Sequence, residues 1–184
     1  MGMLQKRSFA VTAMILMIIV GTLVGSHNSL QDLRGKAELV FTVGRLGDGV
    51  GIQGDLRERN DAAYNMVVIA RKYLPEDNPV IRNVLDARQM LDAAASIGEK
   101  ASANKKLDTA VKDLFDVLNG MSLSEQDARY PQRLYTDFRA RGDTISHDSY
   151  NQTAARFNET LSRFPAGILG SLTGIQPLEF FYGL

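Results

Sequence analysis

The sequence contains no cysteine, and this absence removes several kinds of chemistry at once. Without cysteine the chain forms no disulfide, has no thiolate nucleophile or thiolate metal ligand, and has no cysteine for a bacterial lipid anchor. Tryptophan is also absent, and there are only two histidines. His147 lies near Asp143 and Asp148, but a single histidine with aspartates is a weak metal signal. We therefore predict no catalytic residue, no cofactor and no metal site.

The chain also lacks an excess of charge of either sign, since 21 basic residues balance 21 acidic ones. Proteins that bind nucleic acid usually carry a basic face, so this balance predicts no nucleic-acid partner. The run Arg57-Glu58-Arg59 is predicted to lie on a solvated surface. Nothing in the sequence resembles the turn that presents a nucleophilic serine, and we expect the protein not to be an enzyme.

A long apolar run, Phe9 to Gly25, is the strongest local signal that is present. It contains no charge and, as a helix, extends about 25 Å at about 1.5 Å per residue, near the shortest length that crosses a bilayer. The preferred interpretation is an uncleaved anchor that passes once through the cell membrane, with the lipid bilayer as partner through residues 9–25. A signal peptide cleaved near Val24-Gly25-Ser26 and a buried core helix are the alternatives. Basic residues lie on both sides of the run, so the orientation stays open.

The middle of the chain has the 3–4 spacing of apolar residues that is typical of helices. Asn78-Pro79 is predicted to begin a helix, with asparagine as the N-cap and proline in the first turn. The 3–4 spacing of apolar residues becomes irregular around Gly98 and resumes at Leu107, which predicts either one broken helix or two joined helices. Gly120 is predicted to end this region.

Two further helices are predicted before the C-terminus. The residues Ser122 to Glu125 fit a capping box, and Pro131 is expected to kink the helix that follows or to delay its start. Gly142 is a second point at which that helix is expected to break. The last helix has apolar residues in a 4–3 pattern and ends at Pro165.

The side chains of this last helix fall on two faces. Tyr150, Phe157 and Phe164 are predicted to be core residues, because helical spacing places them together. Asn151 and Asn158 also share a face, and are predicted to bond across helices or to backbone. The tail, residues 166–184, is apolar and glycine-rich, and is predicted to pack on the bundle or to touch the membrane surface.

The segment GVGIQG, residues 49–54, fits the G-x-G-x-x-G pattern of dinucleotide-binding turns. A strand-like run, Ala37 to Val43, precedes it and a helix-like run follows it. A dinucleotide fold also needs a second parallel strand that ends in an acidic residue, and none is found. Nucleotide binding, or an enzyme that uses Gly49, Gly51 and Gly54, is therefore the alternative function.

The preferred interpretation places the same glycines on one helix. Small or apolar residues recur at alternating steps of three and four: Leu30, Leu33, Ala37, Val40, Gly44, Gly47, Gly51 and Gly54. Small residues on such a seam allow a second helix to approach closely. Each glycine costs about 1 kcal/mol relative to alanine, so residues 44–54 are expected to be the least stable part of that helix. A loop or kink without a ligand is the second interpretation.

Several of these residues together resemble the LemA family. After the N-terminal apolar run, Leu33-Arg34 resembles the opening of that family, and LRERND at residues 56–61 resembles its basic stretch. Val84 with Ala87-Arg88 is similar to its second-helix signature. The most specific matches are near the C-terminus: Tyr150-Asn151, Phe157-Asn158, Phe164-Pro165, Gly174 and Phe180-Phe181.

This resemblance implies an all-α fold, with an N-terminal transmembrane helix followed by an elongated antiparallel bundle of long helices. We expect an anchor over residues 1–26, a LemA-like bundle over 27–165 and an apolar tail over 166–184. The family implies no established biochemical activity. The expected function is that of a single-pass membrane-anchored scaffold or interaction protein of bacteria, which associates with itself or with an unknown protein partner.

Overall fold

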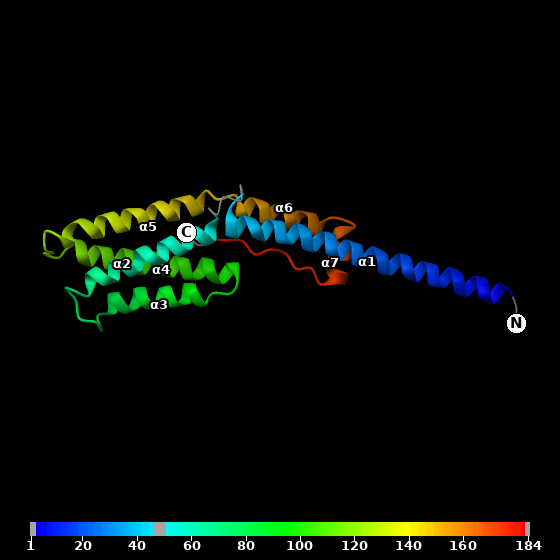
Figure 1. Cartoon of the computed structure of the whole chain (residues 1–184), viewed down its shortest axis with the longest axis horizontal. Helices are drawn as coiled ribbons and strands as arrows, with labels where there is room; N and C mark the ends of the chain where they lie inside the picture. The colour runs from blue at the N-terminus through cyan, green and yellow to red at the C-terminus, as the bar shows by residue number, and fades with distance from the viewer. Residues whose placement is uncertain (1–2, 46–50, 183–184) are drawn as a thin grey trace. The chain divides into compact units, whose positions relative to one another are not determined.

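The computed structural model describes residues 3–45 and 51–182, with side chains from Arg7 onward. Its regular structure is helical, and no strand occurs among these residues. The elements are α1 (Met3–Val43), α2 (Ile52–Ala70), α3 (Pro79–Ala93), α4 (Ile97–Asn119), the 3-10 helix η1 (Asp127–Arg129), α5 (Tyr130–Ser146), α6 (Tyr150–Ser162) and α7 (Ala166–Thr173) (Figure 1). The predicted all-α fold is confirmed.

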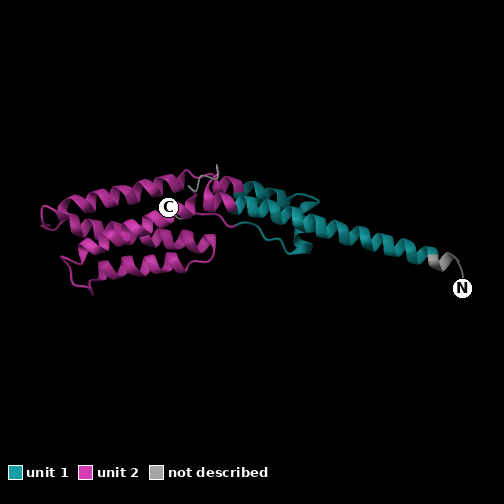
Figure 2. Cartoon of the chain, in the orientation of Figure 1, with its two compact units in different colours: residues 1–38, 154–178 teal, residues 39–153, 179–184 magenta. Residues whose placement is uncertain are grey.

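The chain divides into two compact units (Figure 2). Unit 1 consists of residues 1–38 and 154–178, and unit 2 of residues 39–153 and 179–184. In unit 2, α2 packs against α5 and α3 packs against α4, while α2 also contacts α3 and α4. The predicted apolar stripes meet in this core, whose fully buried large side chains include Leu56, Met66, Ile81, Leu107, Leu114 and Phe138.

Side-chain caps fix where α3 and α4 begin. Asn78 accepts a hydrogen bond from the Val80 amide over 3.0 Å, with proline in the first turn, as predicted. Near Gly98 the chain forms two helices, and a capping box begins the second of them. Ser96 Oγ accepts from the Glu99 amide and Glu99 Oε2 accepts from the Ser96 amide, each over 3.1 Å. Of the two predicted alternatives, the one with two joined helices, α3 and α4, is therefore correct.

The start of α5 differs from the predicted capping box at Ser122. The Ser124 hydroxyl oxygen instead accepts a hydrogen bond from the Asp127 amide over 3.2 Å, and η1 forms there before α5 begins. Pro131 lies in the first turn of α5, where a missing N–H costs little, so the predicted delay is confirmed. The predicted break at Gly142 is wrong, because α5 continues through this buried glycine.

A polar cluster joins the end of α2 to η1. Asp127 accepts hydrogen bonds from Lys72 Nζ and the Tyr73 hydroxyl, each over 2.7 Å, and from the Ser124 hydroxyl over 3.2 Å. The hydrogen bond from Lys72, followed by that from Tyr73, lowers the pKa of Asp127 below its usual value. The same bond raises the pKa of Lys72. The ionised carboxylate therefore holds the two segments together.

We expect acid to weaken this cluster. Because folding lowers the pKa of Asp127, its ionised form contributes stability above the unfolded pKa of about 3.9, and that contribution is lost as the pH falls through the lower folded value. Asp127→Asn should therefore lower the free energy of unfolding at neutral pH, and its deficit relative to the parent should shrink in acid. Urea unfolding of the full chain in detergent, at several pH values, measures the difference. Asp137→Asn, whose contact with Arg133 is exposed and 4.0 Å long, is the control.

Two asparagines of α6 hold the C-terminal tail in extended form. In unit 2, the Asn151 amide donates to the Phe181 carbonyl and its oxygen accepts from the Phe181 amide, each over 2.8 Å. In unit 1, Asn158 makes the same pair of bonds with Leu178, over 2.9 and 2.7 Å. Each asparagine thus replaces one rung of a strand pair, and bonding to backbone is the correct predicted alternative.

The aromatic residues of the last helix are only partly where the spacing predicted them. Tyr150 and Phe157 are buried, at 0% and 5% exposure, as expected for core residues. Phe164 is 84% exposed, so its predicted core position is wrong. The physical reason is that α6 ends at Ser162, and beyond that residue the helical periodicity no longer decides which way a side chain points.

Candidate functional site

Helix α1 carries an exposed apolar surface over its first half. Phe9, Met17 and Val20 are 76%, 69% and 57% exposed. In the described part of the chain, α1 is the helix that is long and apolar enough to cross a membrane, a test of length and composition that a signal sequence also passes. From Leu30 onward one stripe of α1 is buried, with Leu30 at 6% and Ala37 at 3% exposure. One continuous helix therefore joins an exposed apolar part to a packed part.

The glycine-rich segment does not form the predicted helical seam. Helix α1 ends at Val43, and Gly44 has φ of 76°, a left-handed conformation that glycine adopts without strain. Helix α2 begins only at Ile52. The continuous helix over residues 30–54 is therefore wrong, and the second interpretation, a break in the helix, describes Gly44 and Gly51. Gly47 and Gly49 lie outside the described residues.

Gly51 is buried because it packs against the end of α1. A Cβ at this position would lie 2.6 Å from the Phe41 carbonyl oxygen and 2.7 Å from the Gly44 amide nitrogen. The carbonyl end of a helix carries partial negative charge, which disfavours a phosphate at this place. Gly54 lies within the first turn of α2, and the strand-like run before the glycines belongs to α1. Gly51 thus serves close packing between two helix ends.

Gly51→Ala is expected to destabilise the chain by about 1–3 kcal/mol, because backbone atoms on two sides leave no room for the methyl group. Gly35→Ala is the matched control within α1, since its Cβ would meet no neighbouring heavy atom within 4 Å. That substitution should raise stability by up to about 1 kcal/mol through helix propensity. Urea unfolding of the full chain in detergent, followed by circular dichroism, measures both. Equal effects of the two substitutions would contradict the packing described for Gly51.

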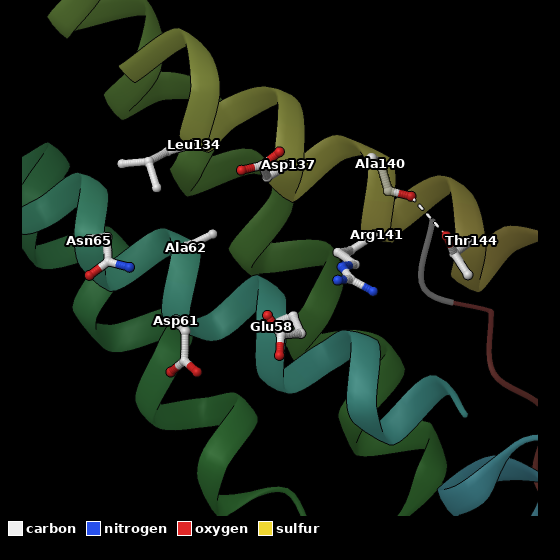
Figure 3. A pocket seen from close by; sticks show the side chains of 9 residues that line it. All are labelled: Glu58, Asp61, Ala62, Asn65, Leu134, Asp137, Ala140, Arg141 and Thr144. Atoms are coloured by element: carbon white, nitrogen blue, oxygen red, sulfur yellow. Dashed lines mark hydrogen bonds between the residues drawn. The ribbon is translucent and has the colours of Figure 1, made fainter. Parts of the chain in front are cut away.

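A groove of about 500 Å³ lies between α2 and α5 in unit 2 (Figure 3). Helix α2 contributes Glu58, Asp61, Ala62 and Asn65, which helical spacing places on one face. Helix α5 contributes the other lining residues, again three and four apart: Leu134, Asp137, Ala140, Arg141 and Thr144. The two alanines leave space between the longer polar side chains.

This groove has an acidic character. The carboxylates of Glu58, Asp61 and Asp137 line it and are exposed to solvent. Arg141, the basic residue in the lining, forms an ion pair with the buried Asp55 over 3.1 Å. The remaining charge is negative, so the groove is chemically suited to basic side chains of a partner. The helical spacing that places these residues on one face of each helix can be seen in the sequence. The packing of α2 against α5, which brings the two faces together, cannot.

Arg59, predicted to lie on a surface, is instead fully buried, whereas Arg57 and Glu58 beside it are exposed. Its Nη2 donates to Asp108 Oδ1 over 2.5 Å, and its guanidinium lies 3.9 Å from the centre of the Phe138 ring. Among the described residues, its Nε and Nη1 have no hydrogen-bond partner. Burial lowers the pKa of Arg59, with Asp108 acting in the opposite direction.

His147 and the two aspartates near it in sequence do not come together as a group. His147 lies 3.8 Å from Asp143 at the end of α5, and both side chains are more than three-quarters exposed. Asp148 turns away to the start of α6, where it accepts a hydrogen bond from the Tyr150 amide over 2.7 Å. Within the described residues no cluster of three or more histidine, cysteine or acidic residues has the geometry of a metal site.

The comparisons with known proteins agree with the resemblance in the sequence. The model of the LemA family matches residues 50–183, which is most of the chain. The match includes α2 to α7 and the asparagine-held tail, and it begins after Gly44 and Gly47. The comparison with curated proteins finds no match.

Proposed function

The chain belongs to the LemA family, and we propose that it is a single-pass membrane-anchored protein that acts by binding other proteins rather than by catalysis. The observation that carries this proposal is the exposed apolar surface of α1, which continues without a break into a packed stripe from Leu30 onward. Such a surface is unfavourable in water and favourable in hydrocarbon, where a helix also satisfies its own backbone groups.

The continuity of α1 supports an anchor that stays attached. Cleavage near Gly25 would cut through the middle of one helix, between its exposed part and its packed part. The test is alkaline extraction of membranes that contain the full chain, combined with intact mass measurement. We expect the protein to resist extraction and to retain its N-terminal residues. A soluble product that begins near Ser26 would show that the apolar run is a signal peptide.

The acidic groove of Figure 3 supports an interaction role. Its carboxylates are exposed and no nucleophile with an adjacent base lines it, which favours docking of a basic segment over chemistry. Crosslinking of the intact protein in its own membrane tests this, with Glu58→Gln and Asp61→Asn combined in one variant. A matched variant, Asp86→Asn with Asp113→Asn, neutralises two exposed carboxylates elsewhere in unit 2.

Loss of a crosslinked partner in the first variant alone, together with weaker crosslinking at high salt, is the expected result. The same products in both variants would contradict a role for the groove. The alternative of nucleotide binding predicts a rise in the unfolding temperature of the full chain in detergent when nucleotide is added. That rise, abolished by Gly51→Ala and not by Gly35→Ala, would favour the alternative function.

A further inference from the structure

Helix α7 presents an apolar face that no other described residue of unit 1 covers. Ile168 and Leu172, four residues apart within α7, are 57% and 69% exposed, and Phe164, which precedes the helix, is 84% exposed. Surface helices of soluble proteins usually place polar residues on the outer face. Here the segment from Phe164 to Leu178 contains no charged residue. A contiguous exposed apolar face of this kind marks a contact with a membrane or a partner.

The opposite face of α7 is fixed within unit 1 by two glycines. A Cβ at Gly167 would lie 2.7 Å from the Leu161 carbonyl oxygen, and one at Gly170 would lie 2.7 Å from Leu161 Cδ2. Gly174 ends the helix with φ of 76°, and the chain then turns to the residues that Asn158 holds. Because the inner face is packed so closely, the outward direction of Ile168 and Leu172 is set by the fold.

The position of α7 along α1 identifies the surface that it meets. A Cβ at Gly170 would lie 3.7 Å from Leu30 Cδ1, so α7 packs beside that residue of α1. Leu30 follows the end of the apolar run, Gly25, by five residues, or about 7.5 Å of helix. Figure 2 shows the N-terminal part of α1 extending beyond the other elements of unit 1. With residues 9–25 placed in the hydrocarbon core, as the proposed anchor requires, a helix about 10 Å wide at this distance would lie at the depth of the lipid headgroups.

We propose that α7 is an interfacial helix that inserts Phe164, Ile168 and Leu172 into the bilayer surface beside the point where α1 leaves it. This inference rests on the proposed membrane anchor. The occupant of the apolar face is a lipid surface, because the face is uncharged and adjoins the apolar run of α1 in the same unit. The second contact restricts the tilt of unit 1 at the membrane, which a single helix does not do.

The absence of tryptophan allows a direct test with single-tryptophan variants of the full chain in phosphatidylcholine vesicles. Phe164→Trp, and separately Ile168→Trp, report on α7, and their native side chains are exposed enough to tolerate the change. Met17→Trp reports on the middle of the apolar run. Leu39→Trp is the matched control, since it is exposed on the same helix about 21 Å beyond Gly25. Lipids brominated near the headgroup or deep in the acyl chain quench tryptophan at the corresponding depth.

We expect the α7 variants to lose emission with shallow bromine, Met17→Trp to lose it with deep bromine, and Leu39→Trp to be unaffected by either. If Met17→Trp is quenched but the α7 variants stay open to water-soluble acrylamide, the anchor stands and this inference is overturned. If the α7 variants are shielded from acrylamide yet unaffected by bromine, a protein surface or second copy covers α7, which also overturns it. If Met17→Trp is not quenched, the proposed anchor itself is wrong and the inference falls with it.

Discussion

Two arginines in the middle of the apolar run, Met17→Arg with Ile18→Arg, are expected to release the chain from the membrane. Each places a permanent charge at a position that is 60% or more exposed, where the proposed environment is hydrocarbon. An arginine at the centre of a membrane helix costs about 2.5–3.5 kcal/mol, and the apolar side chain that it replaces contributes a few tenths more. The pair therefore opposes insertion by about 6–8 kcal/mol, which exceeds what a run of this length has in reserve.

The measurement is the fraction of full-length protein that stays with membranes after alkaline extraction. The parent should be retained and the double variant should move to the soluble or aggregated fraction. Ser29→Arg with Leu33→Arg is the matched control, because both positions are exposed on the same helix beyond the run. That control adds equal charge and should be retained. Equal retention of both double variants would show that residues 9–25 do not lie in hydrocarbon.

Much of the fold could be predicted because helix packing requires an apolar stripe, and such a stripe is visible as spacing. Asn78 shows that a polar residue before proline can be interpreted locally, since its cap needs only residues that follow it at once. The polar cluster around Asp127 could not be predicted in this way. Lys72 and Asp127 are 55 residues apart, and only the packing of the bundle brings them together.

The glycine-rich segment shows where spacing misleads. A 3–4 pattern tells which residues share a face only if the backbone stays helical, and Gly44 ends the helix with a positive φ. The pattern at Gly51 and Gly54 then coincides with a packed helix junction and the start of α2. The same glycine pattern occurs where the backbone approaches a ligand closely and where it approaches a neighbouring helix closely. Only the surrounding structure distinguishes the two cases.

The C-terminal residues that resemble the LemA family are explained by structure rather than by chemistry. Asn151 and Asn158 are needed because an amide side chain both donates and accepts, as one backbone rung does. Phe181 is buried and its ring centre lies 5.9 Å from that of Phe41 in unit 2. Gly174 has a positive φ. These motifs hold the tail in place, whereas Phe164, which the same resemblance includes, is left exposed.

The buried charge at Arg59 was visible in the sequence as an interruption. The apolar face of α2 runs through Ile52, Leu56, Ala63 and Met66, and the helical position missing from the middle of this series is 59. A surface interpretation was natural, because arginine is rarely buried without a partner. Its partner, Asp108, lies on α4, and its aromatic neighbour, Phe138, lies on α5. Neither contact can be predicted from the residues next to Arg59 in the sequence.

Asp108→Ala is expected to lower the free energy of unfolding by about 2–4 kcal/mol, because it leaves the Arg59 guanidinium buried without its anion. The cost is kept below that of a fully enclosed pair because the Asp108 side chain is 42% exposed. Arg59→Met should cost less, since it removes a charge with two unpartnered nitrogens and keeps an apolar side chain of similar length beside Phe138. The combined variant should therefore be more stable than Asp108→Ala alone.

Urea unfolding of the full chain in detergent measures all three variants, and the recovery of stability in the double variant is the diagnostic result. Asp116→Ala is the matched control on the same helix, because its ion pair with Lys112 is exposed on both sides. Removing that pair should cost about 0.3–0.5 kcal/mol. If Asp108→Ala costs no more than this control, water reaches Arg59 and its charge is not buried. A double variant that is less stable than either single variant would instead show that the cation contributes through its contact with Phe138, independently of the carboxylate.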